Sequence, residues 1–374
     1  MSGSFVELTK PKPVFHIKEL LKEAKERDAS DLHLTAGMPP VLRLTGHLAV
    51  LDEYAPLSPE EIKRVLYQVL NRRQIEVLEE RLAVDLAVGI QGAGRFRVNA
   101  YFQRGSLACA FRRLADEIPV LESLGLPESV YSVPDLRDGL VLVTGVTGSG
   151  KSTTLAAIID RINERYRRNI ITVEDPIEYV HYNRKSIINQ RELYTDVPAF
   201  ADALRSALRA DPDVILVGEM RDLDTMRTAI MAAETGHLVF STLHSRDAVS
   251  SIARMVGVFP AEEQAQIRQQ LSASLRAVIS QQLLPRADGK GRLLATEVLM
   301  VTSAVANLIR IGRDEHIRLA IETGKNLGMQ TMEQSLENLV RARAISPSTA
   351  FAAARNPTIL AEKLGMSQAG ANKR

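Results

Sequence analysis

The chain has 374 residues, of which 45% are hydrophobic and 25% are charged, and its formal net charge is +2. These values describe an ordinary globular protein with room for two domains, each with its own core. The near-neutral charge and the 5% aromatic content argue against a nucleic-acid-binding groove. The single cysteine, Cys109, excludes an intramolecular disulfide and any multi-cysteine zinc site.

Hydropathy adds two expectations about location. No apolar run approaches the roughly 20 residues that cross a bilayer, so we expect no direct membrane insertion. The N-terminus also lacks the apolar stretch of a signal peptide, which favours a cytoplasmic protein.

The first third of the chain predicts a small α+β domain over residues 15–115, after a flexible tail over 1–14. Apolar residues follow a helical spacing over 15–27, and residues 30–35 alternate like a strand. Ser58-Pro-Glu-Glu61 carries the signals of a capped helix start, and we expect that helix to bury residues as far as Leu70. Alternating runs at 85–89, 95–99 and 107–112 predict an antiparallel sheet.

The rest of the chain predicts a linker over 116–138, a core domain over 139–360 and a disordered tail over 361–374. Apolar strand-like runs at 139–144, 169–173, 213–219 and 237–244 alternate with helical patterns, which predicts a largely parallel sheet. Helices are expected to fill most of 247–283 and 303–355.

The run from 139 to 144 leads into a loop with the spacing G-x-x-x-x-G-K-S, and a helical pattern follows at once. In this context the glycines let successive backbone N–H groups turn toward phosphate oxygens, at the positive end of the helix. Lys151 would reach the β- and γ-phosphates, and the Ser152 hydroxyl would lie on Mg²⁺. The sequence therefore predicts an ATP or GTP site that comprises Gly145, Thr147, Gly148, Ser149, Gly150, Lys151, Ser152 and Thr153.

Polar residues follow the other predicted strands, and the carboxyl ends of parallel strands meet at one edge of a sheet. Glu219 stands where a Walker B acid would help Ser152 to hold Mg²⁺. Many P-loop enzymes have Asp where this chain has Gly218, so Glu178 becomes the candidate that activates water. His244 could bond the γ-phosphate. The alternatives are that the acidic run at 174–178 caps a helix or faces solvent, and that His244 only packs.

These motifs in series resemble the PilT family of type IV pilus retraction ATPases, within the type II/IV secretion ATPase superfamily. The similarity runs from about Ala29 to Ser346 and is carried by residues 145–152, 172–180, 189–192, 207–213, 217–222, 233–238, 242–244, 259–263 and 327–331. The resemblance implies a PAS-like N-terminal domain and a RecA-like ATPase core that uses ATP and Mg²⁺. It also implies a homohexamer at the cytoplasmic face of the inner membrane, with a pilus platform protein and a paralogous retraction ATPase as partners.

Carried onto this chain, the resemblance makes Lys151 the Walker A lysine, Glu178 the acidic-box catalytic glutamate and Glu219 the Walker B glutamate. His237 and His244 match the histidine box. The family's A-I-R-N-L-I-R-E element stands here as Ala304–Ile311, without its first arginine and terminal glutamate.

Three functions remain open: a retraction motor, a sibling accessory (PilU-like), assembly or type II secretion ATPase, and a nucleotide-binding scaffold that does not hydrolyse. The single cysteine argues against the relatives that carry a four-cysteine zinc insert. A DNA-translocating motor would share the core, but the composition offers it no strand-binding groove.

One further hypothesis concerns the arginines of the N-terminal domain. An arginine finger contributes about 10³–10⁵ in rate, and no arginine of the P-loop core is obviously placed for that role. Arg95, Arg97, Arg112 and Arg113 lie on adjacent predicted strands. We expect Arg97 and Arg112 to act on the nucleotide of the neighbouring subunit, and surface salt bridging is the alternative.

Overall fold

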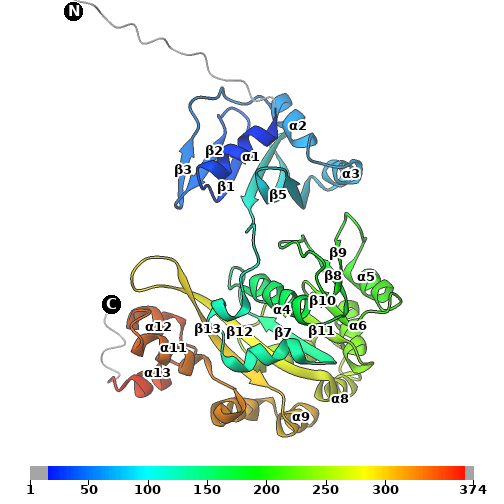
Figure 1. Ribbon diagram of the computed structural model, residues 1–374, viewed down its shortest axis with the longest axis vertical. Helices are drawn as coiled ribbons and strands as arrows, with labels where there is room; N and C mark the ends of the chain where they lie inside the picture. The colour runs from blue at the N-terminus through cyan, green and yellow to red at the C-terminus, as the bar shows by residue number, and fades with distance from the viewer. Residues whose placement is uncertain (1–15, 367–374) are drawn as a thin grey trace, which may run out of the picture. The chain divides into compact units, whose positions relative to one another are not determined.

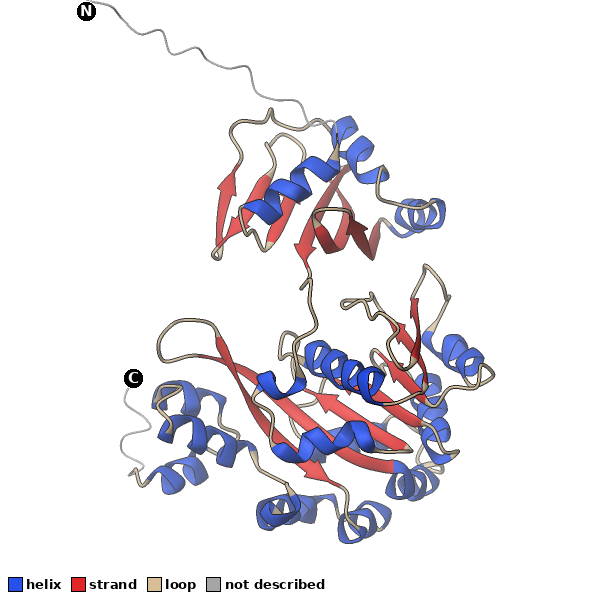
Figure 2. Cartoon of the chain, in the orientation of Figure 1, coloured by secondary structure: helices blue, strands red, loops and turns tan. Residues whose placement is uncertain are grey.

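The computed structural model describes residues 16–366, which form two compact units of mixed α and β structure (Figures 1 and 2). The first unit contains the described residues up to 117 together with two short segments, 175–180 and 192–196. The second unit contains residues 118–174, 181–191 and 197 onward. The tail predicted over 1–14 lies outside the described residues.

The first unit is an α+β fold around a six-stranded antiparallel sheet of order β3-β2-β1-β6-β5-β4. Its elements are α1 (Ile17–Glu26), β1 (Asp31–Leu34), β2 (Val41–Leu44), β3 (His47–Val50), α2 (Pro59–Tyr67), α3 (Arg72–Arg81), β4 (Ala83–Ile90), β5 (Gly94–Gln103) and β6 (Ser106–Arg113). The predicted capping box of Ser58 and Glu61 begins α2. That helix ends at Tyr67 and not at Leu70, because Asn71 and Gln74 form a second capping box that begins α3.

The two faces of this sheet differ in character. Leu32, Phe96 and Phe111 are fully buried on one face, in one cluster with apolar residues of α1 and α2. Cys109 belongs to the same cluster, and burial raises the pKa of its thiol to about 12. The opposite face carries charged residues, since Asp31, Arg112 and Arg97 stand side by side in the register of β1, β6 and β5.

The second unit contains a seven-stranded sheet of order β13-β12-β7-β11-β10-β8-β9. Its strands are β7 (Gly139–Thr144), β8 (Asn169–Glu174), β9 (Ile187–Glu192), β10 (Val214–Val217), β11 (Leu238–Leu243), β12 (Leu275–Pro285) and β13 (Arg292–Met300). Neighbouring pairs from β12 to β8 are parallel, and β13 runs antiparallel to β12. The predicted parallel arrangement of β7, β8, β10 and β11 is confirmed, and the core is RecA-like.

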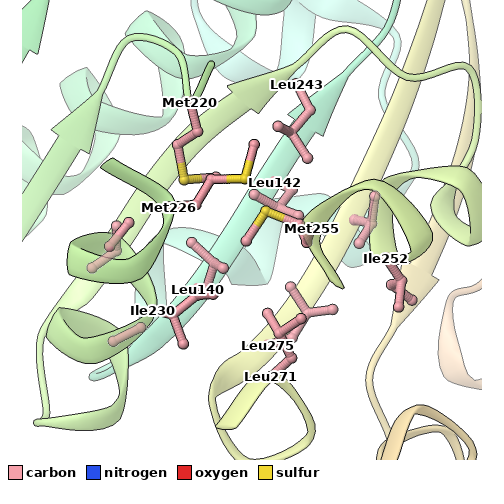
Figure 3. Packing of buried hydrophobic residues seen from close by; sticks show 14 of the residues in the cluster. Leu140, Leu142, Met220, Met226, Ile230, Leu243, Ile252, Met255, Leu271 and Leu275 are labelled. Carbon is pink, nitrogen blue, oxygen red and sulfur yellow. The ribbon is translucent and has the colours of Figure 1, made fainter. Parts of the chain in front are cut away.

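Alternate residues of each strand point to opposite faces of this sheet, and an apolar cluster covers each face. One cluster joins Leu140 and Leu142 of β7 to α6 (Leu223–Glu234), α7 (Ala248–Gly257) and α8 (Gln264–Ser274). Figure 3 shows Met226, Ile230 and Met255 from these helices around the same strand. The other cluster joins Val141 and Val143 to α4 (Lys151–Arg165). The sheet is therefore buried on both sides, as apolar runs without alternation predict.

Two predictions for this unit are wrong. The helical pattern expected as far as 283 ends at Ser274, and β12 and β13 follow as a long hairpin. A buried apolar run can be a strand or a helix, so its periodicity alone did not distinguish the two. The expected linker over 116–138 is instead packed on the second unit from Ile118 onward, because Leu121, Val130 and Val133 are buried against α4.

The chain from 303 onward is helical, as predicted. It forms α9 (Ser303–Arg310), α10 (Ile317–Thr323), α11 (Met332–Arg341), α12 (Pro347–Ala353) and α13 (Pro357–Leu364). The disorder predicted from 361 is wrong for the last turn of α13, where Leu360 and Ala361 are buried. The rest of that predicted tail, residues 367–374, lies outside the described residues. Within residues 16–366, no helix has the length and apolar character needed to cross a membrane.

Candidate nucleotide-binding site

The carboxyl ends of the parallel strands are aligned at one edge of the sheet in the second unit. Thr144 at the end of β7 pairs with Leu243 of β11 and with Ser280 of β12. Val217 of β10 pairs with Val173 of β8. Glu174, the last residue of β8, and the residues that follow the other strands, Gly145, His244 and Gly218-Glu219, therefore lie at the same edge of the sheet. Open α/β sheets bind their ligands at this edge.

The loop after β7 has the backbone of a phosphate-binding loop. Gly145, Gly148 and Gly150 have φ angles of 144°, 77° and 91°, a region that residues with a Cβ rarely enter. α4 begins at Lys151, directly behind Gly150, which has no side chain with which to cap the helix. The first N–H groups of a helix have no intrahelical partner and favour an anion. The Ser149 hydroxyl is buried and has no hydrogen-bond partner among the described residues. These features fit the phosphates of a nucleotide.

Lys151 is folded back onto this loop. Its Nζ donates to the carbonyl oxygens of Gly145 and Val146, at 3.0 and 3.1 Å, and the residue is only 9% exposed. A buried ammonium group stabilises the closely spaced carbonyls of the loop and stays next to the phosphate position.

Strand β12 supports the loop from its other side. A Cβ on Gly145 would lie 2.5 Å from the Gln281 carbonyl oxygen and 2.5 Å from Ser149 Oγ, so only glycine fits there. Gln281 Nε2 donates to Thr154 Oγ1 of α4 at 2.7 Å, and Thr144 and Ser280 join their hydroxyls at 2.8 Å. Sequence reasoning missed Gln281 because its segment was expected to be helical.

Glu219 and His244 are brought together at the same edge. Glu219 Oε2 lies 3.5 Å from His244 Nε2, and Glu219 Oε1 lies 2.5 Å from Arg221 Nε. Thr242 of β11 donates its hydroxyl to the Gly218 carbonyl at 2.6 Å and so fixes the turn before Glu219. His237 lies at the opposite end of β11, where its carbonyl accepts from Gly139, so the two histidines cannot share one ligand.

The acidic run after β8 divides into residues with different surroundings. Glu174 remains in the second unit, where Oε1 accepts from Thr172 Oγ1 at 2.7 Å and from Gln190 Nε2 at 3.1 Å. Gln190 Oε1 accepts in turn from the backbone N–H of His181. These bonds give Glu174 a structural role at the end of β8.

Glu178, by contrast, groups with the first unit. Its Oε1 lies 3.9 Å from Arg97 Nη1, and Arg97 Nε lies 3.9 Å from Asp85. Arg112 Nε donates to Asp31 at 2.9 Å while its side chain stays 71% exposed. The structure thus brings Lys151, Glu219 and His244 together in one unit and Glu178 and Arg97 together in the other.

The metal prediction rests on few protein ligands. Residues 16–366 contain no cluster of three or more His, Cys, Asp or Glu side chains that could hold an ion by itself. Mg²⁺ in nucleotide sites takes one or two protein oxygens together with phosphates and water. Ser152, in the first turn of α4, and Glu219 fit that donor set.

Comparison with known proteins decides the family. A family model described as "Type II/IV secretion system protein" matches residues 9–347, which is most of the chain. The chain belongs to this family.

Individual relatives within the secretion family agree with this assignment. The type IV pilus retractation ATPase PilT of Pseudomonas aeruginosa is 47% identical over 341 residues, which cover 91% of this chain and 98% of that protein. The type IV pilus ATPase PilU of the same organism is 39% identical and covers 93% of this chain and 91% of its own length. A crystal structure of the pilus retraction motor PilT with bound ADP superposes with a TM-score of 0.87, at 48% identity, over 93% of this chain and all of that chain.

The sequence alone did not predict the contact between Arg95 and Glu192. Glu192 lay in a motif that supported the resemblance, and Arg95 was one of four candidate arginines. No local sequence pattern could predict that their side chains contact each other, because they are 97 positions apart in the chain.

Proposed function

We propose that this chain is an ATP-hydrolysing motor that works as a homohexamer and powers the retraction of type IV pili, which supports twitching motility. The observation that carries the proposal is the full-length similarity to PilT: 47% identity over 98% of a protein named as a pilus retractation ATPase. The loop from Gly145 to Ser152 supplies the matching chemistry, since its backbone and Lys151 form a cradle for phosphates.

Each candidate residue has a defined task in this proposal. The N–H groups of the loop and Lys151 bind the phosphates of ATP, and Ser152 and Glu219 hold Mg²⁺, which would neutralise phosphate charge when bound. Glu178 accepts the proton of the attacking water. His244, 3.5 Å from Glu219, senses the γ-phosphate. Arg97 and Arg112 act across the ring on the nucleotide of a neighbouring subunit.

The proposal includes a place and partners. A retraction motor acts at the cytoplasmic face of the inner membrane, docked on the platform protein of the pilus, and a paralogous retraction ATPase joins it there. We propose that this chain is peripheral to the membrane and does not contact nucleic acid.

The test is genetic and uses one catalytic variant. Deletion of the gene should leave cells that extend pili but do not retract them, as seen by fluorescence microscopy of labelled pili. The wild-type gene should restore retraction, and Glu178→Gln should not, although it assembles normally. Loss of pilus extension on deletion would show an assembly motor instead, and full rescue by Glu178→Gln would show a scaffold.

An accessory role of the PilU type is the second candidate. It is favoured by 39% identity over 93% of the chain and by the altered element at Ala304–Ile311. The two roles separate in a strain without any paralogous retraction ATPase. A primary motor retracts pili alone in that strain, whereas an accessory ATPase does not.

A further inference from the structure

The first unit contains a partly buried ion pair that holds the backbone next to Glu178. Arg95 Nη2 lies 3.1 Å from Glu192 Oε2, and the Glu192 side chain is only 7% exposed. We call these two side chains, with the backbone of Ile177 between them, the Arg95–Glu192 clamp. The clamp joins β5 to both segments, 175–180 and 192–196, that group with this unit.

Both polar backbone groups of Ile177 are held by the clamp. Arg95 Nε donates to the Ile177 carbonyl at 2.8 Å, and the Ile177 N–H donates to Glu192 Oε2 at 3.1 Å. The carbonyl belongs to the peptide that joins Ile177 to Glu178. Charge-assisted bonds are stronger than neutral ones, so this peptide has little freedom to rotate.

Other contacts hold Glu192 itself in place. Its N–H donates to Asp196 at 2.8 Å, and the backbone N–H of Ala87 on β4 bonds to its carboxylate. Gln74 of α3 donates to Thr195 at 3.3 Å. The clamp is therefore anchored on two strands and a helix of the first unit.

We propose that Arg95 and Glu192 are positioning residues for Glu178, which they act on through the Ile177 peptide. The inference rests on the proposed function of Glu178 as the residue that activates water. A general base works only when it lies within hydrogen-bond reach of its proton, so a small displacement is costly. The Glu178 carboxylate itself is partly exposed and lies 3.9 Å from Arg97 Nη1, so the clamp acts on its backbone and not on its side chain.

The experiment measures turnover and binding separately in the full-length hexamer. Arg95→Ala and Glu192→Gln should each lower kcat by about tenfold or more, while the Kd for a fluorescent ADP analogue changes by less than about twofold. Arg95→Lys should recover part of kcat, because one ammonium group can bond to Glu192 or to the Ile177 carbonyl but lacks the fork that reaches both. Arg113→Ala is the matched control, since Arg113 lies on the same sheet and pairs with exposed Asp28.

A double-mutant cycle distinguishes positioning from an independent effect. If Arg95 acts through Glu178, then Arg95→Ala should not reduce the residual single-turnover rate of Glu178→Gln any further. A multiplicative loss in that background would overturn the inference, and so would a normal kcat in Arg95→Ala and Glu192→Gln. Near-normal turnover of Glu178→Gln would instead remove the proposed role of Glu178, and the clamp would lose its target. Thermal unfolding and the size of the assembly verify that each variant is folded.

Discussion

Asp247 Oδ2 lies 2.7 Å from Arg355 Nη1, an ion pair that ties the start of α7 to the connection between α12 and α13. Glu297 of β13 lies next to it and accepts the Ala248 N–H at 2.9 Å. Burial raises the pKa of Glu297 to about 7, against the pull of that N–H and of Arg355, and the carboxylates of Asp247 and Glu333 raise it further. A carboxyl whose pKa is raised to about 7 therefore lies beside the ion pair that ties α7 to the C-terminal helices.

This pKa predicts how stability depends on pH. The folded chain holds the Glu297 proton more tightly than the unfolded chain, so its contribution to stability is fully present below about pH 4.5 and is lost as pH rises through about 7. The loss is about 3 kcal/mol at most. Glu297→Gln keeps the acceptor for Ala248 and cannot ionise.

We therefore expect the difference in Tm between Glu297→Gln and wild type to grow by about 5 °C between about pH 5 and about pH 8.5. Differential scanning fluorimetry without nucleotide measures it. The exposed Glu322→Gln is the control and should show a flat difference. A difference for Glu297→Gln that does not change with pH would contradict the prediction.

Lys151→Ala should weaken nucleotide binding, whereas Glu178→Gln should keep binding and lose hydrolysis. In the proposed mechanism Lys151 contacts the ground-state phosphates, whereas Glu178 acts as a base in the transition state. We expect the Kd for ATP to rise at least about tenfold in the first variant and kcat to fall about 100-fold or more in the second. Equilibrium binding and steady-state phosphate release separate the two effects. Lys290→Ala, in the exposed hairpin turn, should change neither, and near-normal turnover in Glu178→Gln would refute its role.

Glu219→Gln should also lose turnover, through a misplaced metal or water. The carboxylate is 14% exposed at the strand end and lies between Arg221 and His244. We expect kcat to fall about tenfold or more in Mg²⁺, with unchanged ADP affinity in EDTA, where no metal can be misplaced. The exposed Glu262→Gln should behave as wild type. Equal loss of ADP affinity with and without metal would indicate a folding defect.

Two inactive proteins should restore each other if the arginines act across the ring. Mixed hexamers of Arg112→Ala and Glu178→Gln contain some sites with an intact Glu178 and a neighbour's intact Arg112. ATPase activity should rise on co-assembly, and the same design applies to Arg97. Verified mixed hexamers that show no recovery for either arginine would count against the hypothesis, and Arg112 would then be left with its ion pair to Asp31.

Cys109 should be inert in the folded protein. Because burial raises its pKa to about 12, almost none of it is thiolate at pH 8, and the side chain is also inaccessible. A thiol reagent such as Ellman's reagent should label one thiol per chain in concentrated guanidinium chloride and none in buffer. Rapid labelling of the native protein would mean that the N-terminal sheet opens easily.

The sequence predicts best what is encoded locally. The P-loop needs only glycines at set positions, a lysine and a following helix, and the structure has these in place from Gly145 to Lys151. The sequence also placed Glu219 and His244 at one edge of the sheet, because each follows a predicted parallel strand and the carboxyl ends of parallel strands meet at one edge. The Arg95–Glu192 clamp did not follow, because its partners are distant in sequence and its central contact is to backbone. Nor did the hairpin of β12 and β13, since a buried apolar run has no period that tells strand from helix.

Strand β12 has one consequence beyond its place in the sheet. Successive side chains of a strand point to opposite faces, so Gln281 reaches Thr154 in α4 while Gln282 donates to the Ala353 carbonyl of α12 at 3.5 Å. The carbonyl of the same Gln281 packs on Gly145. Two adjacent residues of β12 therefore contact the end of α12 on one face of the sheet and the first turns of α4 on the other.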